Sequence, residues 1–354
     1  MENNLYKKIL GSLSMVAIGD ALGMPCHDMT IDEIRKRFGG PVETFKPPFD
    51  DTRVHRNLTA AQITDDTILT LALAKAYIQN DGRITPSSIS ACFLESYQRS
   101  EAAGNGTMFG PSTRRALEAI VAGNDPVKTG LEEKHPMSGA SNGAAMKIAP
   151  VGLVHPADVD AAIQDAVTVC LPSHCTQTAI ASACAIAAGV AEAMSPEADV
   201  FSVVKATLYG ARQGEAIGMK KARTVPLPSV AERIELAVSL ALKARDSDAA
   251  NRSFANIIGT GLSAYESIPT AVGIFVAAAG DPRRCVIAGA NVGYDTDTIA
   301  SMAGALAGAL KGFDAVPQDL FREVKKENDL NLEEIARGLE RIARVNLNKK
   351  KSTE

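Results

Sequence analysis

Tryptophan is absent from this chain of 354 residues, and aromatic side chains make up only 5% of it. A core without large rings has to be built mainly from Ala, Leu, Ile and Met, which allow helices to approach one another closely. Hydrophobic residues (46%) and charged residues (22%) occur at the levels of an ordinary globular protein. The length is sufficient for one large domain or two.

Strong charge of either sign is also lacking. The chain carries 37 basic and 41 acidic residues, a net charge of −4, and its only basic block is the short "NKKK" at 348–351. Binding to a phosphate backbone requires a basic surface, so nucleic acid is excluded as the main partner. No oligomeric state is specified by these features, and we expect a monomer or a homodimer.

No uninterrupted apolar run reaches the roughly 18 residues that would indicate a membrane span. "ILGSLSMVAIGDALGM" is interrupted by Asp20 and lacks the flanks of a signal peptide. The six cysteines form no C-x-x-C pair and several lie in apolar surroundings. We therefore expect reduced, buried cysteines, no membrane contact and a cytoplasmic location.

Alternating β-type segments are almost missing, whereas helical periodicity dominates, which predicts an all-α fold: a compact multi-helix bundle. The expected helices are 5–22, 66–80, 86–98, 111–122, 157–170, 174–193, 198–216, 228–246, 268–279, 281–290, 298–311, 317–326 and 331–345. The segments 178–194 and 298–310 are apolar on nearly every side and belong at the centre of the bundle. Small residues at 303, 304, 307 and 308 permit close backbone approach.

The irregular segments 23–64, 100–112 and 129–147 are rich in Pro, Gly and Ser, and long loops in a compact domain are often functional. No linker divides the chain. We expect one domain over residues 1–346 and a frayed tail over 347–354.

Two acidic helix starts stand out. Thr64-Asp65-Asp66-Thr67 precedes one apolar helix, and Asp295-Thr296-Asp297-Thr298 precedes another. An N-cap explains each of them alone. Together they predict more, because converging carboxylates repel one another unless a cation lies among them. Asp295 and Asp297 are expected on one side of an extended segment, whereas Asp65 and Asp66 diverge and suit two neighbouring ions.

Carboxylate and hydroxyl oxygens suit Mg²⁺ or Mn²⁺ as ligands. Zinc is disfavoured, because His27, His55, His135 and His155 lack the spacing of zinc ligands.

Five ordered motifs resemble the ADP-ribosylglycohydrolase family: "GDALGMP" (19–25), "TDDT" (64–67), "SNGAAMKIAP" (141–150), "SHCTQ" (173–177) and "GYDTDTIASMAGALAGA" (293–309). The resemblance implies an all-α domain with a two-Mg²⁺ site in a central cleft. By position, it implies these metal ligands: Thr64, Asp65, Asp66, Asp295, Asp297 and Thr298.

The same resemblance implies that the glycine-rich segment before "NGAAM" receives the diphosphate and ribose. It would be formed by Ser138, Gly139, Ala140, Ser141, Asn142 and Gly143, with Gly110 on the same wall and His174 at the substrate. Small residues and a helix N-terminus expose N–H groups that favour phosphate. A plain glycine-rich connection, and a capping or core histidine at 174, remain the alternatives.

One position departs from the family pattern. Relatives usually carry a glutamate where this chain has His27, and Asp28 follows it. Asp28 and His27 are therefore the candidate catalytic residues, together with Asp66. Tyr294 replaces a usual glycine and is a candidate substrate contact, and Ala140 stands where some relatives have an aromatic residue.

The sequence thus predicts a Mg²⁺-dependent hydrolase of a ribosyl bond, acting on an ADP-ribosylated protein or small molecule. Two alternatives remain open: a hydrolase of nucleosides or other small ribosides, and a catalytically silent module that binds ADP-ribose or a related nucleotide. Arginine, serine, acetyl and a free base all remain possible as the leaving group.

Overall fold

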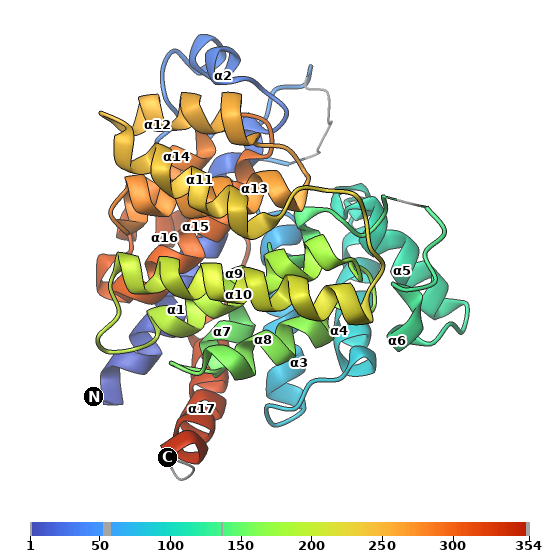
Figure 1. The fold of residues 1–354 in the computed structure, drawn as a ribbon. Coiled ribbons are helices and arrows are strands. Elements are labelled where there is room, and N and C mark those ends of the chain that lie inside the picture. Colours follow the sequence, from blue (N-terminus) through green and yellow to red (C-terminus); the bar gives the residue numbers. More distant parts are fainter. Residues whose placement is uncertain (1, 52–57, 136, 352–354) are drawn as a thin grey trace.

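The computed structural model describes residues 2–51, 58–135 and 137–351. Within these ranges the protein is helical, with isolated β-bridges and no strand, so the all-α prediction is confirmed. The helices, shown in Figure 1, are α1 (Glu2–Gly23), α2 (Ile31–Phe38), α3 (Asp65–Gln79), α4 (Pro86–Ala102), α5 (Pro111–Val121), α6 (Pro126–Thr129), α7 (Ala149–Val154), α8 (Val159–Cys170), α9 (Gln177–Ala193), α10 (Val200–Lys221), α11 (Val230–Lys243), α12 (Ser247–Ser253), α13 (Ala264–Ala277), α14 (Pro282–Ala290), α15 (Thr296–Lys311), α16 (Gln318–Glu327) and α17 (Leu332–Lys351).

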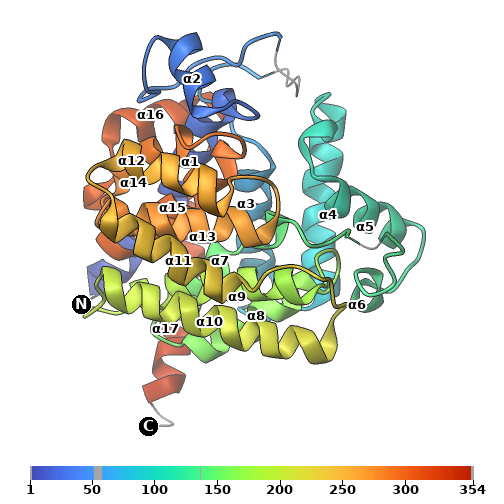
Figure 2. The same ribbon diagram turned by 45° about the horizontal axis from the view of Figure 1, so that its top comes forward.

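The centre of the bundle is formed by α1, α9 and α15, whose residues are buried almost throughout. Helix α15 packs along α1, and α9 packs along α10. The other helices surround them, and α4, α5 and α6 lie together at one side (Figure 2). The sequence prediction that the most apolar segments are central is therefore confirmed, and all six cysteines are free and buried.

Glycines bring α1 and α15 into backbone contact. A Cβ atom at Gly308 would lie 2.3 Å from the carbonyl oxygen of Gly11, and one at Gly304 would lie 2.6 Å from that of Met15. Neither distance can accommodate a side chain. This close packing fixes the end of α1, including Asp20, beside the start of α15.

We expect Gly308→Ala to destabilise the fold by about 1–3 kcal/mol, since overpacking a rigid contact forces the backbones apart. Urea unfolding measures the change. Gly338→Ala is the matched control, because its Cβ would meet only the movable side chain of Ile78. Equal stability of the two variants would contradict a tight α1–α15 contact.

Several helices were not predicted. The polar region 23–64 contains α2, which is held by a capping box between Thr30 and Glu33. Helices α6, α7 and α12 are also additions, and a π-helical turn follows α12 over Phe254–Ile258. These pieces are too short for their periodicity to show in the sequence. Their caps alone gave no sufficient signal.

Helix α17 continues to Lys351, past the end expected at 345 and into the tail expected to be frayed. Residues 352–354 lie outside the described residues, as does His55. The single-domain boundary at 346 stays a prediction. Among the described residues, one helical segment, Asn4–Cys26, is long and apolar enough to cross a membrane, but its apolar 18-residue window is buried inside the protein, as in a core helix.

Candidate metal centre and substrate cavity

The two acidic helix starts meet, as the sequence predicted. Asp65 and Asp66 begin α3, and Asp297 lies in the first turn of α15. The Thr298 hydroxyl donates to Asp66 Oδ2 at 3.4 Å across the 232 residues that separate them. Carboxylate oxygens of Asp20, Asp66 and Asp297 all lie within 4.8 Å of one another.

One expected detail is wrong. Asp295 and Asp297 do not share an extended segment, because α15 begins at Thr296 and Asp295 is its N-cap residue. The Thr296 hydroxyl donates to the carbonyl of Gly23 at 2.8 Å, which ties the helix start to the end of α1. The carboxylates of Asp295 and Asp297 nevertheless both lie next to His27 Nδ1. Asp65 and Asp66 diverge as expected, since Asp65 Oδ2 accepts the Gly110 N–H at 3.4 Å.

Asp66 has the clearest need for a cation. Its side chain is buried, and its Oδ1 atom accepts no hydrogen bond within the described part of the chain. Burial, followed by the charges of Asp20 and Asp297, raises its pKa well above the ordinary value. An ionised, buried and unpartnered oxygen is costly, and a divalent cation removes that cost. The donor set, carboxylates with threonine hydroxyls, suits Mg²⁺ or Mn²⁺.

Asp20 belongs to this centre but was not predicted. Its oxygens accept from the backbone N–H groups of Thr64 (2.9 Å) and Thr67 (3.1 Å) and from both threonine hydroxyls. Burial raises the pKa of Asp20 to about 6. It therefore holds the 64–67 turn in place from α1. An acidic residue inside an otherwise apolar run was the available signal in the sequence.

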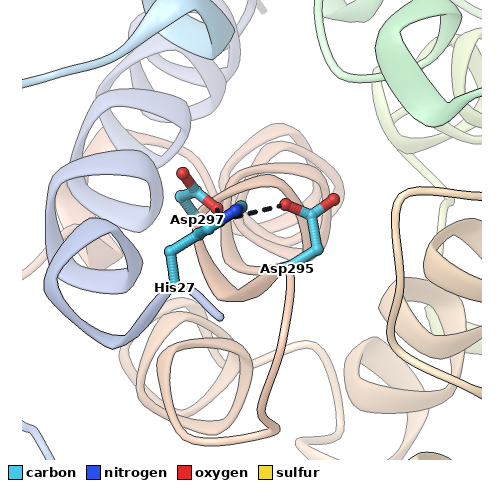
Figure 3. Close-up of side chains that lie close together, drawn as sticks. All are labelled: His27, Asp295 and Asp297. Carbon is cyan, nitrogen blue, oxygen red and sulfur yellow. Dashed lines mark hydrogen bonds and ion pairs between the residues drawn. The ribbon is translucent and has the colours of Figure 1, made fainter. Parts of the chain in front are cut away.

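His27 faces the pair of aspartates, as Figure 3 shows. Its Nδ1 atom lies 2.8 Å from Asp297 Oδ1 and 3.4 Å from Asp295 Oδ1. The Asp295 side chain also accepts a hydrogen bond from the Asn142 amide. Burial and then the charge of Asp297 raise the pKa of Asp295 to about 7. The candidate substrate residue Asn142 is thus in contact with the acidic centre.

A cavity of about 310 Å³ opens from the acidic centre. Its wall includes Asp65, Asp66, Asp295, Asp297, Thr298 and His27, and also Gly110, Ser141, Asn142, Gly143 and His174. Thr64, Ser138, Gly139, Ala140, Asp28 and Tyr294 lie outside this wall. A larger cavity of about 830 Å³ between α3, α4 and α17 is mainly apolar and is lined by no residue of the acidic centre.

The predicted glycine-rich segment is fixed by backbone bonds to a neighbouring loop. The Asn142 N–H donates to the carbonyl oxygen of Leu262 at 2.9 Å, and the Ala264 N–H donates to that of Ala140 at 3.2 Å. Gly143 is required by close packing, because a Cβ there would lie 2.6 Å from His174 Nε2.

His174 is held between two serine hydroxyls, Ser141 at 3.2 Å and Ser173 at 2.7 Å. Burial lowers its pKa well below the ordinary value, so it is neutral.

Asp28 and Tyr294 connect the loop after α1 to the start of α15. The Asp28 N–H donates to the carbonyl oxygen of Tyr294 at 2.7 Å, and the Tyr294 N–H donates to that of Met29 at 2.8 Å. Both residues have left-handed φ angles, 67° and 60°. Backbones of this kind are retained where the surroundings fix them, often at functional sites. The link holds His27 in register with the aspartates.

Arg114 is a cavity residue that the sequence did not reveal. It lies in the first turns of α5, and its buried Nε atom has no hydrogen-bond partner in the ranges that the structure describes. Among the described residues, it is the only Lys or Arg on the cavity wall. Gly110, the N-cap of α5, leaves open space where a side chain would be. Nothing in the local sequence distinguishes Arg114 from an exposed helical arginine.

The whole chain is similar to one known family. The ADP-ribosylglycohydrolase model matches residues 1–350. YegU of Escherichia coli (strain K12) is 34% identical over 335 residues, 94% of this chain and 96% of that one. ADP-ribosylarginine hydrolase Tri1 of Pseudomonas putida (strain GB-1) is 25% identical over 89% of this chain and 73% of its own.

Human ADP-ribosylhydrolase ARH3 is similar over a shorter stretch. It is 35% identical over 95 residues, 24% of this chain and 26% of that one. Among solved structures, the "ADP-ribosylglycohydrolase-related protein complex" superposes with a TM-score of 0.65 at 22% identity, over 96% of this chain and 99% of that one. At this identity the structural likeness establishes the fold.

Proposed function

The chain belongs to the ADP-ribosylglycohydrolase family, whose members hydrolyse glycosidic bonds, and we propose that it uses Mg²⁺ or Mn²⁺ to release ADP-ribose from a modified protein or small molecule. The observation that carries the proposal is the buried Asp66 Oδ1, which has no hydrogen-bond partner in the described ranges and lies at the meeting point of two acidic helix starts and the end of a cavity.

The residues that would hold the cations are the predicted ones, Thr64, Asp65, Asp66, Asp295, Asp297 and Thr298, with Asp20 positioning the 64–67 turn. Bound there, divalent cations orient the ribose hydroxyls and make a nearby water more acidic.

The chain's own groups would then act on the substrate. Glycoside cleavage passes through an oxocarbenium-like state, which the surrounding carboxylates stabilise. The neutral His174 and Asn142 bind and orient hydroxyl groups. The roles of His27, Asp28 and Asp66 as proton-transfer residues stay predictions. Separate Asp28→Ala and His27→Ala variants test the roles of those two residues. If both variants turn over substrate at the wild-type rate, neither His27 nor Asp28 transfers a proton in the reaction.

A smaller riboside is the second candidate, because the cavity volume is at the lower end of the range of about 300–1,000 Å³ for ligand sites. Arg114 favours the first candidate, since a guanidinium on the wall whose Nε has no hydrogen-bond partner among the described residues suits a diphosphate.

We expect Arg114→Ala to raise KM about 10- to 100-fold for ADP-ribosylated substrates and to leave nucleoside turnover unchanged, since a charged hydrogen bond contributes about 1.5–3 kcal/mol. Steady-state kinetics on both substrate classes measures this. Arg212→Ala is the control, because Arg212 pairs with Glu235 and does not line the cavity. Equal effects of both variants would contradict a role of Arg114 at the diphosphate.

The function itself is tested by incubating the protein with ADP-ribosyl-arginine, an ADP-ribosyl-serine peptide, O-acetyl-ADP-ribose and a nucleoside panel. Each reaction is run with Mg²⁺, with Mn²⁺ and with EDTA, and Asp297→Ala is included. We expect ADP-ribose release that EDTA and the substitution abolish. Nucleoside turnover alone favours the small-riboside hydrolase. Tight ADP-ribose binding without any turnover indicates the silent binding module, and would overturn the hydrolase proposal.

A further inference from the structure

His27 gives this centre a nitrogen atom where the other candidate ligands offer oxygen. The residue follows α1, and its loop is pinned to Tyr294, the residue before Asp295, by two backbone hydrogen bonds. Its side chain is only 12% exposed. Figure 3 shows the imidazole directed toward the two carboxylates from a different helix end. The loop thus presents Nδ1 to the aspartates in a fixed position.

The distances fit three ligands around one ion. Nδ1 lies 2.8 Å from Asp297 Oδ1 and 3.4 Å from Asp295 Oδ1, and all three atoms lie within 4.8 Å of one another. Neighbouring ligands at about 2.1 Å from an octahedral ion are separated by about 3.0 Å. The two measured distances lie on either side of that value. A single N–H···O bond would need only one of the two carboxylates.

The second acidic group differs in chemistry. Asp20, Asp66 and Asp297 offer oxygen atoms only, whereas His27, Asp295 and Asp297 offer one nitrogen and two oxygens. Mg²⁺ prefers oxygen ligands, while imidazole suits first-row transition ions, whose affinity rises along the series from Mn²⁺. Asp297 is common to both groups. The centre therefore has two chemically unlike groups of candidate ligands, which share the Asp297 carboxylate.

Resting on the metal-dependent function proposed above, we propose that His27 Nδ1 is a direct ligand of one of the two cations, and that this position selects a first-row transition dication such as Mn²⁺ over Mg²⁺. The other cavity histidine does not compete for this role. Both ring nitrogens of His174 lie at hydrogen-bond distance from serine hydroxyls, and that residue belongs to neither acidic group.

Pulsed EPR of the Mn²⁺-loaded wild-type protein tests the proposal directly. Coordination by imidazole produces a ¹⁴N modulation of the Mn²⁺ signal, which changes when the protein is prepared with ¹⁵N-histidine. We expect this modulation in the wild-type protein, its loss in His27→Glu, and its retention in His135→Gln, which alters an exposed histidine. The wild-type spectrum alone decides whether a histidine is a ligand, even where a variant fails to fold, and His27 is the one histidine in the acidic groups of the described residues.

Calorimetric titration with Mn²⁺ and Mg²⁺ tests the selectivity. We expect His27→Glu, which restores an all-oxygen set, to lower the Mn²⁺/Mg²⁺ affinity ratio about tenfold or more. Stoichiometric Mn²⁺ binding without ¹⁴N modulation, or an unchanged ratio, would overturn the assignment of His27 and leave the hydrolase proposal standing. A wild-type protein that binds neither cation would overturn both the assignment of His27 and the metal-dependent hydrolase proposal. Metal-independent turnover in the substrate panel would remove the cation requirement only.

Discussion

Asp66→Asn is expected to abolish metal-dependent hydrolysis while making the metal-free protein more stable. Loss of the buried carboxylate removes a ligand and lowers turnover by about 1,000-fold or more. In EDTA at pH 8, the same change relieves the repulsion between Asp66 and the carboxylates of Asp20 and Asp297. We expect the melting temperature to rise by a few degrees, since single buried charges cost several kcal/mol.

A fall in turnover together with a rise in the melting temperature distinguishes a metal ligand from an acid with only a structural role. Asp81→Asn is the control, because Asp81 is exposed, has a φ of 48° that asparagine tolerates, and should change neither quantity. The stabilisation should also vanish at low pH, where Asp66 is protonated. An Asp66→Asn protein that is active, or less stable than wild type in EDTA at pH 8, would rule out a cation beside this residue.

Stabilisation by a divalent cation is expected to grow as the pH rises from 5 to 8. Burial raises the pKa of Asp20 to about 6 and that of Asp295 to about 7, from an ordinary 3.8. Because these folded-state values exceed the unfolded ones, the metal-free protein keeps their full contribution below about pH 4. It loses this contribution as the pH rises through 6 to 7. Cations compete with protons for the same oxygens, so the stabilisation by a bound cation increases as the pH rises.

Melting curves with saturating Mn²⁺ or with EDTA, recorded at half-unit pH steps, measure this difference. We expect a small melting shift at pH 5 and the largest shift above pH 7.5. Asp297→Ala is the control and should show little shift at any pH, because it removes the carboxylate common to both acidic groups. A wild-type shift that does not change with pH would mean that the binding oxygens do not titrate in this range.

Much of the fold was predictable because it follows from local properties. Long apolar segments become central helices since no other arrangement buries every face, as for α9 and α15. The caps at Thr64, Thr85 and Asp281 begin helices within a residue of the expected positions. The short helices α2, α7 and α12 were missed, because pieces of six to eight residues are stabilised by packing and not by their own sequence.

The candidate site, like the fold, could be predicted only in part from the sequence. Oxygen-rich helix starts at 64–67 and 295–298 were visible as patterns. Their convergence was expected because both begin apolar helices of the core, and the repulsion between close carboxylates then indicated a cation. The participation of Asp20 and Arg114 was not visible. One looked like an interruption in an apolar helix and the other like a surface charge. The position of His27 relative to Asp295 and Asp297 depends on the contact between the loop after α1 and the segment before α15, where the left-handed residues Asp28 and Tyr294 have no local signature.

By itself, the sequence determined the longer helices, the lack of a basic excess and the two groups of acidic residues, because caps, periodicity and charge act between near neighbours. Only the tertiary structure decided which atoms share the centre. Glycines 11 and 308 let two backbones touch, and that contact places Asp20 beside Asp297 and His27 beside the aspartates, about 270 residues along the chain. Such distances are set by how whole helices pack, and no stretch of sequence contains that information on its own.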